Sequence, residues 1–164
     1  MTRPTAAGRA QRAAATDPYR HAIYDAEAEA LPGGGRRFSR FAHLEAYVTD
    51  ITTGHWWATT FPDAPLEVDV LRRSRSATFS AAHVSTDASA GVVWIRDGSW
   101  DTVTVVHELA HVAAGPAPDP TGAHGRRFAT ALLDCWRELL GFPAYGALRS
   151  GYDRRGVPYQ RDRR

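Results

Sequence analysis

Residues 102–114 form a nearly apolar segment that carries three ionisable groups, His107, Glu108 and His111, near its middle. Valine, leucine and alanine side chains lie on both flanks of the histidine pair, so the segment predicts a helix buried inside a protein core. The β-branched stretch from 102 to 106 makes a strand the local competitor. Because unpaired ionisable groups are costly to bury, the chain must fold around a polar centre.

The spacing of the ionisable groups indicates a metal. His107 and His111 are four residues apart, so on a helix they lie one turn apart on the same face and can bind one ion together. Glu108 borders that face, where it can take a proton from metal-bound water. The pattern predicts a zinc site of the catalytic kind, which usually has three protein ligands and one position for water.

The third ligand must come from elsewhere in the chain, and we expect it to be His124. This histidine follows a loop of small, turn-forming residues, 115–123, and opens the next predicted helix. Phe128 lies one turn further along the apolar stripe of that helix, so its burial would press His124 toward the first two histidines. The alternative ligand is Glu138, the only glutamate after Glu108.

With these residues identified, the chain resembles the minimal zincin metallopeptidases of the SprT-like kind. Those proteins pair an HExxH helix with a downstream His-Gly-x-x-Phe segment, which here is His124 to Phe128. The chain is also similar to small actinobacterial metallohydrolases that have a leading helix, a Trp-Trp pair and a short sheet before the same two helices. The resemblance covers about residues 18–158.

The resemblance implies that His107, His111 and His124 bind one Zn²⁺ per chain and that Glu108 is the general base. It implies a zinc-dependent peptidase that cleaves amide bonds of a peptide or protein substrate through zinc-bound water. SprT-like proteins often carry a zinc ribbon of four cysteines, whereas this chain has only Cys135, which we expect to be a core thiol. The nucleic-acid targeting of those relatives is therefore not implied.

Length and pattern predict one α+β domain, since 164 residues with 43% hydrophobic side chains can bury a core. We expect a disordered leader at 1–16, a zincin-like domain at 17–150 and a basic tail at 151–164. The domain should be a small, mostly antiparallel sheet packed on the HExxH helix and a following C-terminal helix. The expected elements before that helix are helices at 17–30 and 38–52 and strands at 66–71, 77–86 and 91–96. We expect Asp17 to cap the first helix. The HExxH helix should begin at a cap formed by Ser99 or Asp101 and end at Gly115.

No signal peptide, disulfide pair or long apolar run is visible, so we expect a cytoplasmic protein without a membrane partner. Two alternatives to the peptidase stay open. One is a non-catalytic binding module that uses zinc as a staple. The other is a nucleic-acid-associated protein, supported by six arginines between 149 and 164 and a pI near 9.0, although a net charge of +2 argues against strong electrostatic binding.

Several residues are candidates for substrate contacts. The strand at 91–96 can be an edge strand that pairs with an extended peptide, or an ordinary core strand. Trp56 and Trp57 can line a groove or cover the edge of the core, and His83 can be a fourth polar group of the site. His21, His43 and His55 are expected at the surface. The donor that stabilises the oxyanion is expected among five side chains: His83, Tyr145, Arg149, Tyr152 and Tyr159.

Overall fold

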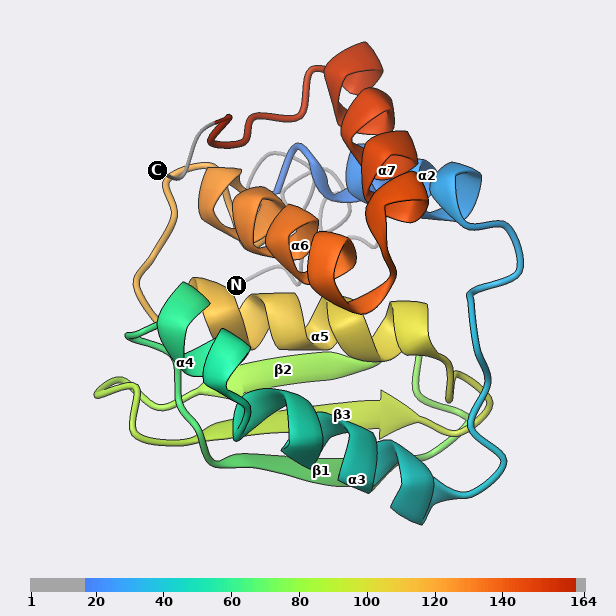
Figure 1. The fold of residues 1–164 in the computed structure, drawn as a ribbon, viewed down its shortest axis with the longest axis vertical. Helices are drawn as coiled ribbons and strands as arrows, with labels where there is room; N and C mark the ends of the chain where they lie inside the picture. Colours follow the sequence, from blue (N-terminus) through green and yellow to red (C-terminus); the bar gives the residue numbers. More distant parts are fainter. Residues whose placement is uncertain (1–16, 162–164) are drawn as a thin grey trace, which may run out of the picture.

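The computed structural model describes residues 17–161, and the leader predicted for 1–16 lies outside them. The chain folds as α+β, with helices and a small sheet in the order shown in Figure 1. The helices are α2 (Arg20–Ala30), α3 (Phe41–Thr52), α4 (His55–Thr60), α5 (Thr102–Ala114), α6 (Arg126–Leu139) and α7 (Phe142–Arg155). The strands are β1 (Val68–Arg73), β2 (Ala81–Val84) and β3 (Gly91–Arg96).

The sheet has the strand order β1-β3-β2, with β1 parallel and β2 antiparallel to β3. It is therefore mixed, and the prediction of a mostly antiparallel sheet was wrong. Of the two alternatives for 91–96, the core strand is the one that the structure shows, because β3 lies in the centre of the sheet. Its run Val92 to Ile95 is the most apolar of the three strands, so β3 gains most from neighbours on both edges.

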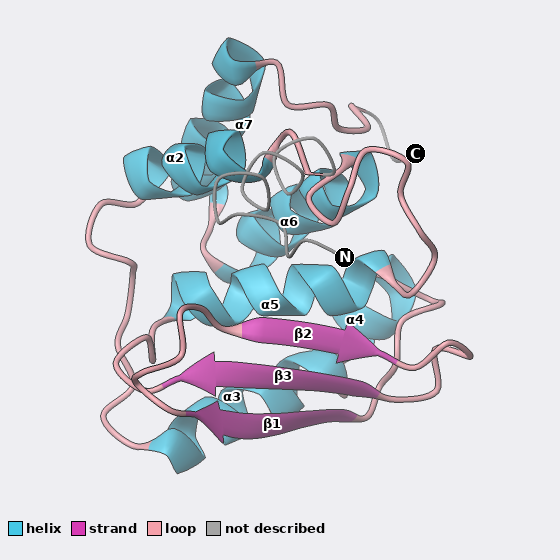
Figure 2. Ribbon diagram, turned by 180° about the vertical axis from the view of Figure 1, so that it is seen from behind, coloured by secondary structure: helices cyan, strands magenta, loops and turns pink. Residues whose placement is uncertain are grey.

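Helices are stacked above the sheet in successive contacts. Helix α5 packs on β2 and β3, α6 packs on α5, and α7 packs on both α6 and α2 (Figure 2). Helix α3 packs on β1. The HExxH helix therefore lies between the sheet and α6, and it is buried along most of its length as its apolar flanks predict.

The structure selects Asp101 over Ser99 as the cap of α5 and confirms that the helix ends at Gly115. Asp101 is its N-cap, and its side chain accepts hydrogen bonds from the backbone N–H of Thr104 at 2.9 Å and from the Thr104 hydroxyl at 3.1 Å. Gly115 follows the last turn with a φ of 75°, a conformation that favours glycine. Residues 102–106 are helical although they include several β-branched residues, because the N-cap and the tertiary packing of α5 outweigh their strand preference.

Other boundaries differ from the predictions. Helix α2 begins at Arg20 without a side-chain cap, so Asp17 does not cap it. Phe38 precedes α3 but is still buried, and the short helix α4 was not anticipated. Helix α7 continues past residue 150, and Tyr152 and Val157 are buried, so the first half of the predicted tail is part of the folded domain. Among residues 17–161, no helix is both long and apolar enough to cross a membrane.

Candidate metal centre

The three predicted ligand histidines meet in the structure. His107 and His111 lie on α5, and His124 lies just before α6. One ring nitrogen from each can be chosen so that all lie within 4.8 Å of one another, and the rings of His107 and His124 are almost fully buried. The three side chains can therefore hold one metal ion.

Two carboxylates orient two of these rings. Nδ1 of His107 lies 2.9 Å from Oε2 of Glu27, and Nδ1 of His124 lies 2.7 Å from Oδ2 of Asp17. Glu27 lies on α2 and Asp17 lies three residues before that helix begins, so one N-terminal segment supports both histidines. A carboxylate on the far nitrogen of a ligand histidine fixes its ring and tautomer in metal sites.

The remaining nitrogens face each other as metal ligands would. When Nδ1 of each ring donates to its carboxylate, Nε2 of each neutral ring carries a lone pair. The Nε2 atoms of His107 and His124 lie 3.2 Å apart. Such lone pairs repel unless a cation or proton lies between them. Tetrahedral zinc with Zn–N of about 2.0–2.1 Å separates two nitrogens by roughly 3.3 Å, so the spacing fits a shared ion.

Burial controls the charge of these groups. It lowers the pKa of His111 well below its usual value, and charge on His107 or His124 lowers it further. Burial also lowers the pKa of His124, which favours the neutral ring that binds metal. At His107 burial acts in the same direction, but the charge and hydrogen bond of Glu27 outweigh it and raise the pKa. Burial raises the pKa of Glu108 to about 7, against the opposing charge of His107.

Phe128 packs against all three histidines, as the predicted stripe on α6 requires. Its ring centroid lies 5.0 Å from that of His107, 4.1 Å from His111 and 4.8 Å from His124. The side chain is 2% exposed and seals one side of the cluster with apolar surface. The alternative ligand, Glu138, is exposed near the far end of α6 and does not join the cluster.

The loop before α6 is held in shape by Asp119. Its carboxylate accepts the backbone N–H of Thr121 at 2.8 Å and that of Arg127 at 3.2 Å. A Cβ at Gly125 would collide with Asp119 and Thr121, so glycine is required where the loop turns into the helix. This packing holds His124 just before the first turn of α6.

Tyr24 is a site residue that the sequence reasoning missed. Its ring stacks on His107 with centroids 4.9 Å apart and planes 12° apart, and the residue is 39% exposed. The Arg20 guanidinium lies 5.8 Å from the Tyr24 ring centroid. Burial and then the charge of Glu108 raise the pKa of Tyr24, so its hydroxyl stays protonated and can donate a hydrogen bond.

A signal for the α2 residues was present in the sequence. Glu27 lies one residue after Ala26 and four after Ile23, both fully buried, so it is a carboxylate on the apolar face of a helix. Such a group needs a partner in the core. Asp17 carried no comparable signal, because an aspartate before a proline is also typical of a helix start.

A cavity of about 460 Å³ opens beside His111. Its walls include Ala82, His83 and Val84 of β2, Phe128, and the loop at 114–119. His83 thus lines the space next to the cluster without joining it. Since β2 pairs only with β3 among the described strands, its other edge has no strand partner there.

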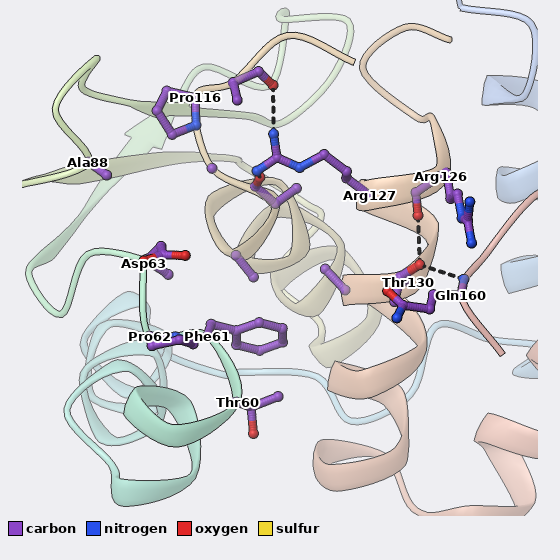
Figure 3. Close-up of a pocket in the computed structure, with 16 residues that line it drawn as sticks. Thr60, Phe61, Pro62, Asp63, Ala88, Pro116, Arg126, Arg127, Thr130 and Gln160 are labelled. Carbon is purple, nitrogen blue, oxygen red and sulfur yellow. Dashed lines mark hydrogen bonds between the residues drawn. The ribbon is translucent and has the colours of Figure 1, made fainter. Parts of the chain in front are cut away.

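Arg127 forms a wall between this cavity and a second one of about 470 Å³. Its guanidinium donates to the carbonyl oxygens of Ala114 at 2.6 Å and Ala117 at 3.3 Å. Figure 3 shows Arg127 reaching from α6 toward the Pro116 segment. On α6 the Thr130 hydroxyl donates to the carbonyl oxygen of Arg126 at 2.7 Å and accepts the backbone N–H of Gln160, which follows α7, at 2.9 Å. Arg127 therefore keeps the 114–117 loop close to the helix that follows His124.

The other predicted substrate contacts lie elsewhere. Trp57 is fully buried and donates to the carbonyl oxygen of Pro65 at 3.1 Å, which confirms a core role for it. Tyr152 on α7 is fully buried, and the Tyr159 hydroxyl donates to Asp153 and accepts from Arg149. Tyr145 lines a small pocket together with Tyr159, away from the three histidines. Cys135 is buried, as expected of a core thiol.

Comparisons of this chain with protein-family models, curated proteins and solved structures found no match, so the evidence for what the site does is its own geometry.

Proposed function

We propose that this protein is a zinc-dependent hydrolase that cleaves amide bonds, most simply those of peptides. The observation that carries the proposal is the incomplete ligand set. Among the described residues, no fourth histidine, cysteine or carboxylate joins His107, His111 and His124. Structural zinc sites are closed by four protein ligands, whereas catalytic sites leave one position for water or substrate. The set therefore favours an enzyme over a zinc-stapled binding module.

The residues around the cluster have separate tasks in this proposal. A divalent ion held by the three histidines would supply Lewis-acid activation of the carbonyl and of water. Glu108, next to His107 and 5% exposed, takes a proton from the attacking water and delivers it to the leaving nitrogen. Asp17 and Glu27 hold the ligand rings through their Nδ1 atoms.

Tyr24 is the residue we assign to the oxyanion. Its half-exposed ring lies on His107, and Arg20 beside it adds positive charge at the same place. A hydroxyl aimed at the oxygen that becomes negative stabilises the transition state. His83, which lines the cavity at His111, is the remaining candidate from the sequence prediction.

The edge of β2 that lacks a partner among the described strands supports a peptide as the substrate. An extended chain can add to a free strand edge through backbone hydrogen bonds, which recognise no particular side chain. The cavity beside His111 lies between β2 and the 114–119 loop, so a peptide on this edge would pass the cluster. The edge strand in this proposal is β2 and no longer the strand at 91–96.

The test is a pair of matched substitutions. Glu108→Gln keeps size and shape but removes the base, so we expect full zinc content and a loss of about 10²–10⁴-fold in turnover of a peptide library. Glu138→Gln, at an exposed position on α6, should leave both unchanged. Zinc is measured by mass spectrometry and turnover by product release. Equal turnover of Glu108→Gln and wild type would end the catalytic assignment.

A further inference from the structure

Several arginines lie close together at the end of the sheet where the parallel strands β1 and β3 end, away from the three histidines. Arg72 and Arg73 close β1, and Arg96 closes β3 in register with Arg73. The segment before α3 joins them, because the Phe38 N–H donates to Trp100 at 2.8 Å and the Thr102 N–H to Arg36 at 2.9 Å. Residues far apart in the chain thus bring their positive charge to one end of the sheet.

An open surface pocket of about 260 Å³ lies at this end of the sheet. It is lined by three arginines (Arg37, Arg72 and Arg75), by Asp97, and by the rings of Phe38 and Trp100. Three cations and one anion leave a net charge of +2 on the ionised lining groups. This net positive charge favours binding of an anion.

The hydrogen bonds of the lining groups leave this charge uncompensated. Asp97 pairs with Arg72 through two contacts of 3.1 Å, and the Arg37 guanidinium donates to the carbonyl oxygen of Gly98 at 3.0 Å. Within residues 17–161, the Arg75 guanidinium has no carboxylate or hydrogen-bond partner. By contrast, Arg154 and Arg155 near the C-terminus both pair with Glu29.

Part of the pocket wall is fixed by contacts within the chain. The Arg72 guanidinium lies 5.1 Å from the Trp100 ring centroid while it bonds Asp97, so its position is set from two sides. Gly98 has a φ of 97°, and a Cβ there would lie 3.7 Å from Nε of Arg75. The positive φ therefore favours glycine at this position next to Arg75.

We propose that this pocket binds the phosphate group of a small phosphorylated molecule. Guanidinium groups match phosphate oxygens with paired N–H donors, and several arginines around one space favour a doubly charged oxyanion. The volume lies below the range of roughly 300–1,000 Å³ that holds drug-sized ligands, so a phosphate and few further atoms fit. The site is separate from the three histidines and does not depend on the proposed hydrolase activity.

The test is a titration of ¹⁵N-labelled, metal-loaded protein with inorganic phosphate and with ethyl phosphate, followed by NMR. We expect saturable shifts of the Trp100 indole N–H and the Gly98 N–H. Arg75→Gln should weaken binding by at least about fivefold, in line with the loss of a charge-assisted hydrogen bond. Arg137→Gln, an exposed cation on α6, is the matched control and should change it less than about twofold.

Three outcomes would overturn the proposal. The first is equal affinity of Arg75→Gln and wild type. The second is that phosphate shifts only the signals around His111 and His124, which would place binding at the metal centre. The third is that a short oligothymidylate binds far more tightly than ethyl phosphate and shifts Arg36 and Arg96 as well, which would make the surface a nucleic-acid site.

Discussion

The carboxylate of Asp17 holds His124 at two points, accepting its backbone N–H at 3.1 Å and lying 2.7 Å from its Nδ1. The two residues are 107 positions apart in the chain. Glu27 makes the corresponding contact with His107. The candidate metal centre is therefore built by three segments: α5, the loop before α6, and the N-terminal residues around α2.

Removing either orienting carboxylate should weaken metal binding while the fold persists. We expect Asp17→Asn and Glu27→Gln each to lower zinc affinity by about 10–100-fold, because the ligand ring loses its fixed tautomer and orientation. Affinity is measured by competition with a chromophoric chelator, and folding by circular dichroism. Asp25→Asn, an exposed acid on α2, is the control. Unchanged affinity in both variants would show that these contacts do not serve the metal.

His124→Ala should lose zinc as completely as His111→Ala, because each removes one of three ligands. Chelation of the wild type should lower its melting temperature, since the ligands tie α5 to the start of α6. Glu138→Ala should retain the metal. The ligand assignment fails if His124→Ala keeps its zinc and Glu138→Ala does not.

Tyr24→Phe should separate a chemical role from a packing role. Phenylalanine preserves the ring that stacks on His107 but removes the hydroxyl. We expect unchanged zinc content and KM, with kcat reduced by about 10²-fold, the usual effect of losing one oxyanion donor. Tyr47→Phe on α3, remote from the cluster, is the control. A normal kcat for Tyr24→Phe would move the donor role to His83, tested next as His83→Ala.

Phe128→Ala should destabilise the domain by about 3–5 kcal/mol, because it leaves a cavity where a nearly buried ring contacts three histidines. Urea unfolding of the zinc-free protein measures this effect apart from any loss of metal. Phe142→Ala, at a position 72% exposed, should change the free energy of unfolding by no more than about 0.5 kcal/mol. Equal stabilities of the two variants would contradict the packing described here.

Deletion of residues 161–164 should leave nucleic-acid retention unchanged. Arg161 pairs with Asp153 at 3.2 Å on the surface, so its positive charge is already balanced within the chain. Exposed pairs of this kind contribute only about 0–1 kcal/mol to the free energy of unfolding, so the deletion should also leave the fold intact. Retention is measured on a DNA column over a range of salt concentrations. A steep, salt-dependent loss of binding on deletion would support the nucleic-acid alternative.

Local patterns in the sequence were enough to predict the centre of the site. The i,i+4 histidines, the Asp101 cap, the Gly115 stop and the bounds of β3 all depend on residues close together in the chain. His124 was predictable because Phe128 follows it one turn later on a strongly apolar stripe. In each case neighbouring residues carry the whole signal, through helix periodicity or a terminal hydrogen bond.

Only the tertiary structure decided what surrounds that centre. Asp17, Glu27 and Tyr24 reach the histidines from α2 and the residues before it, with the Glu27–His107 contact spanning 80 residues. No local periodicity encodes such a meeting, since it depends on how α2 packs on α7 and how α7 returns over α6. The order β1-β3-β2 has the same origin, because which strand gains two neighbours depends on competition between pairings across the whole chain.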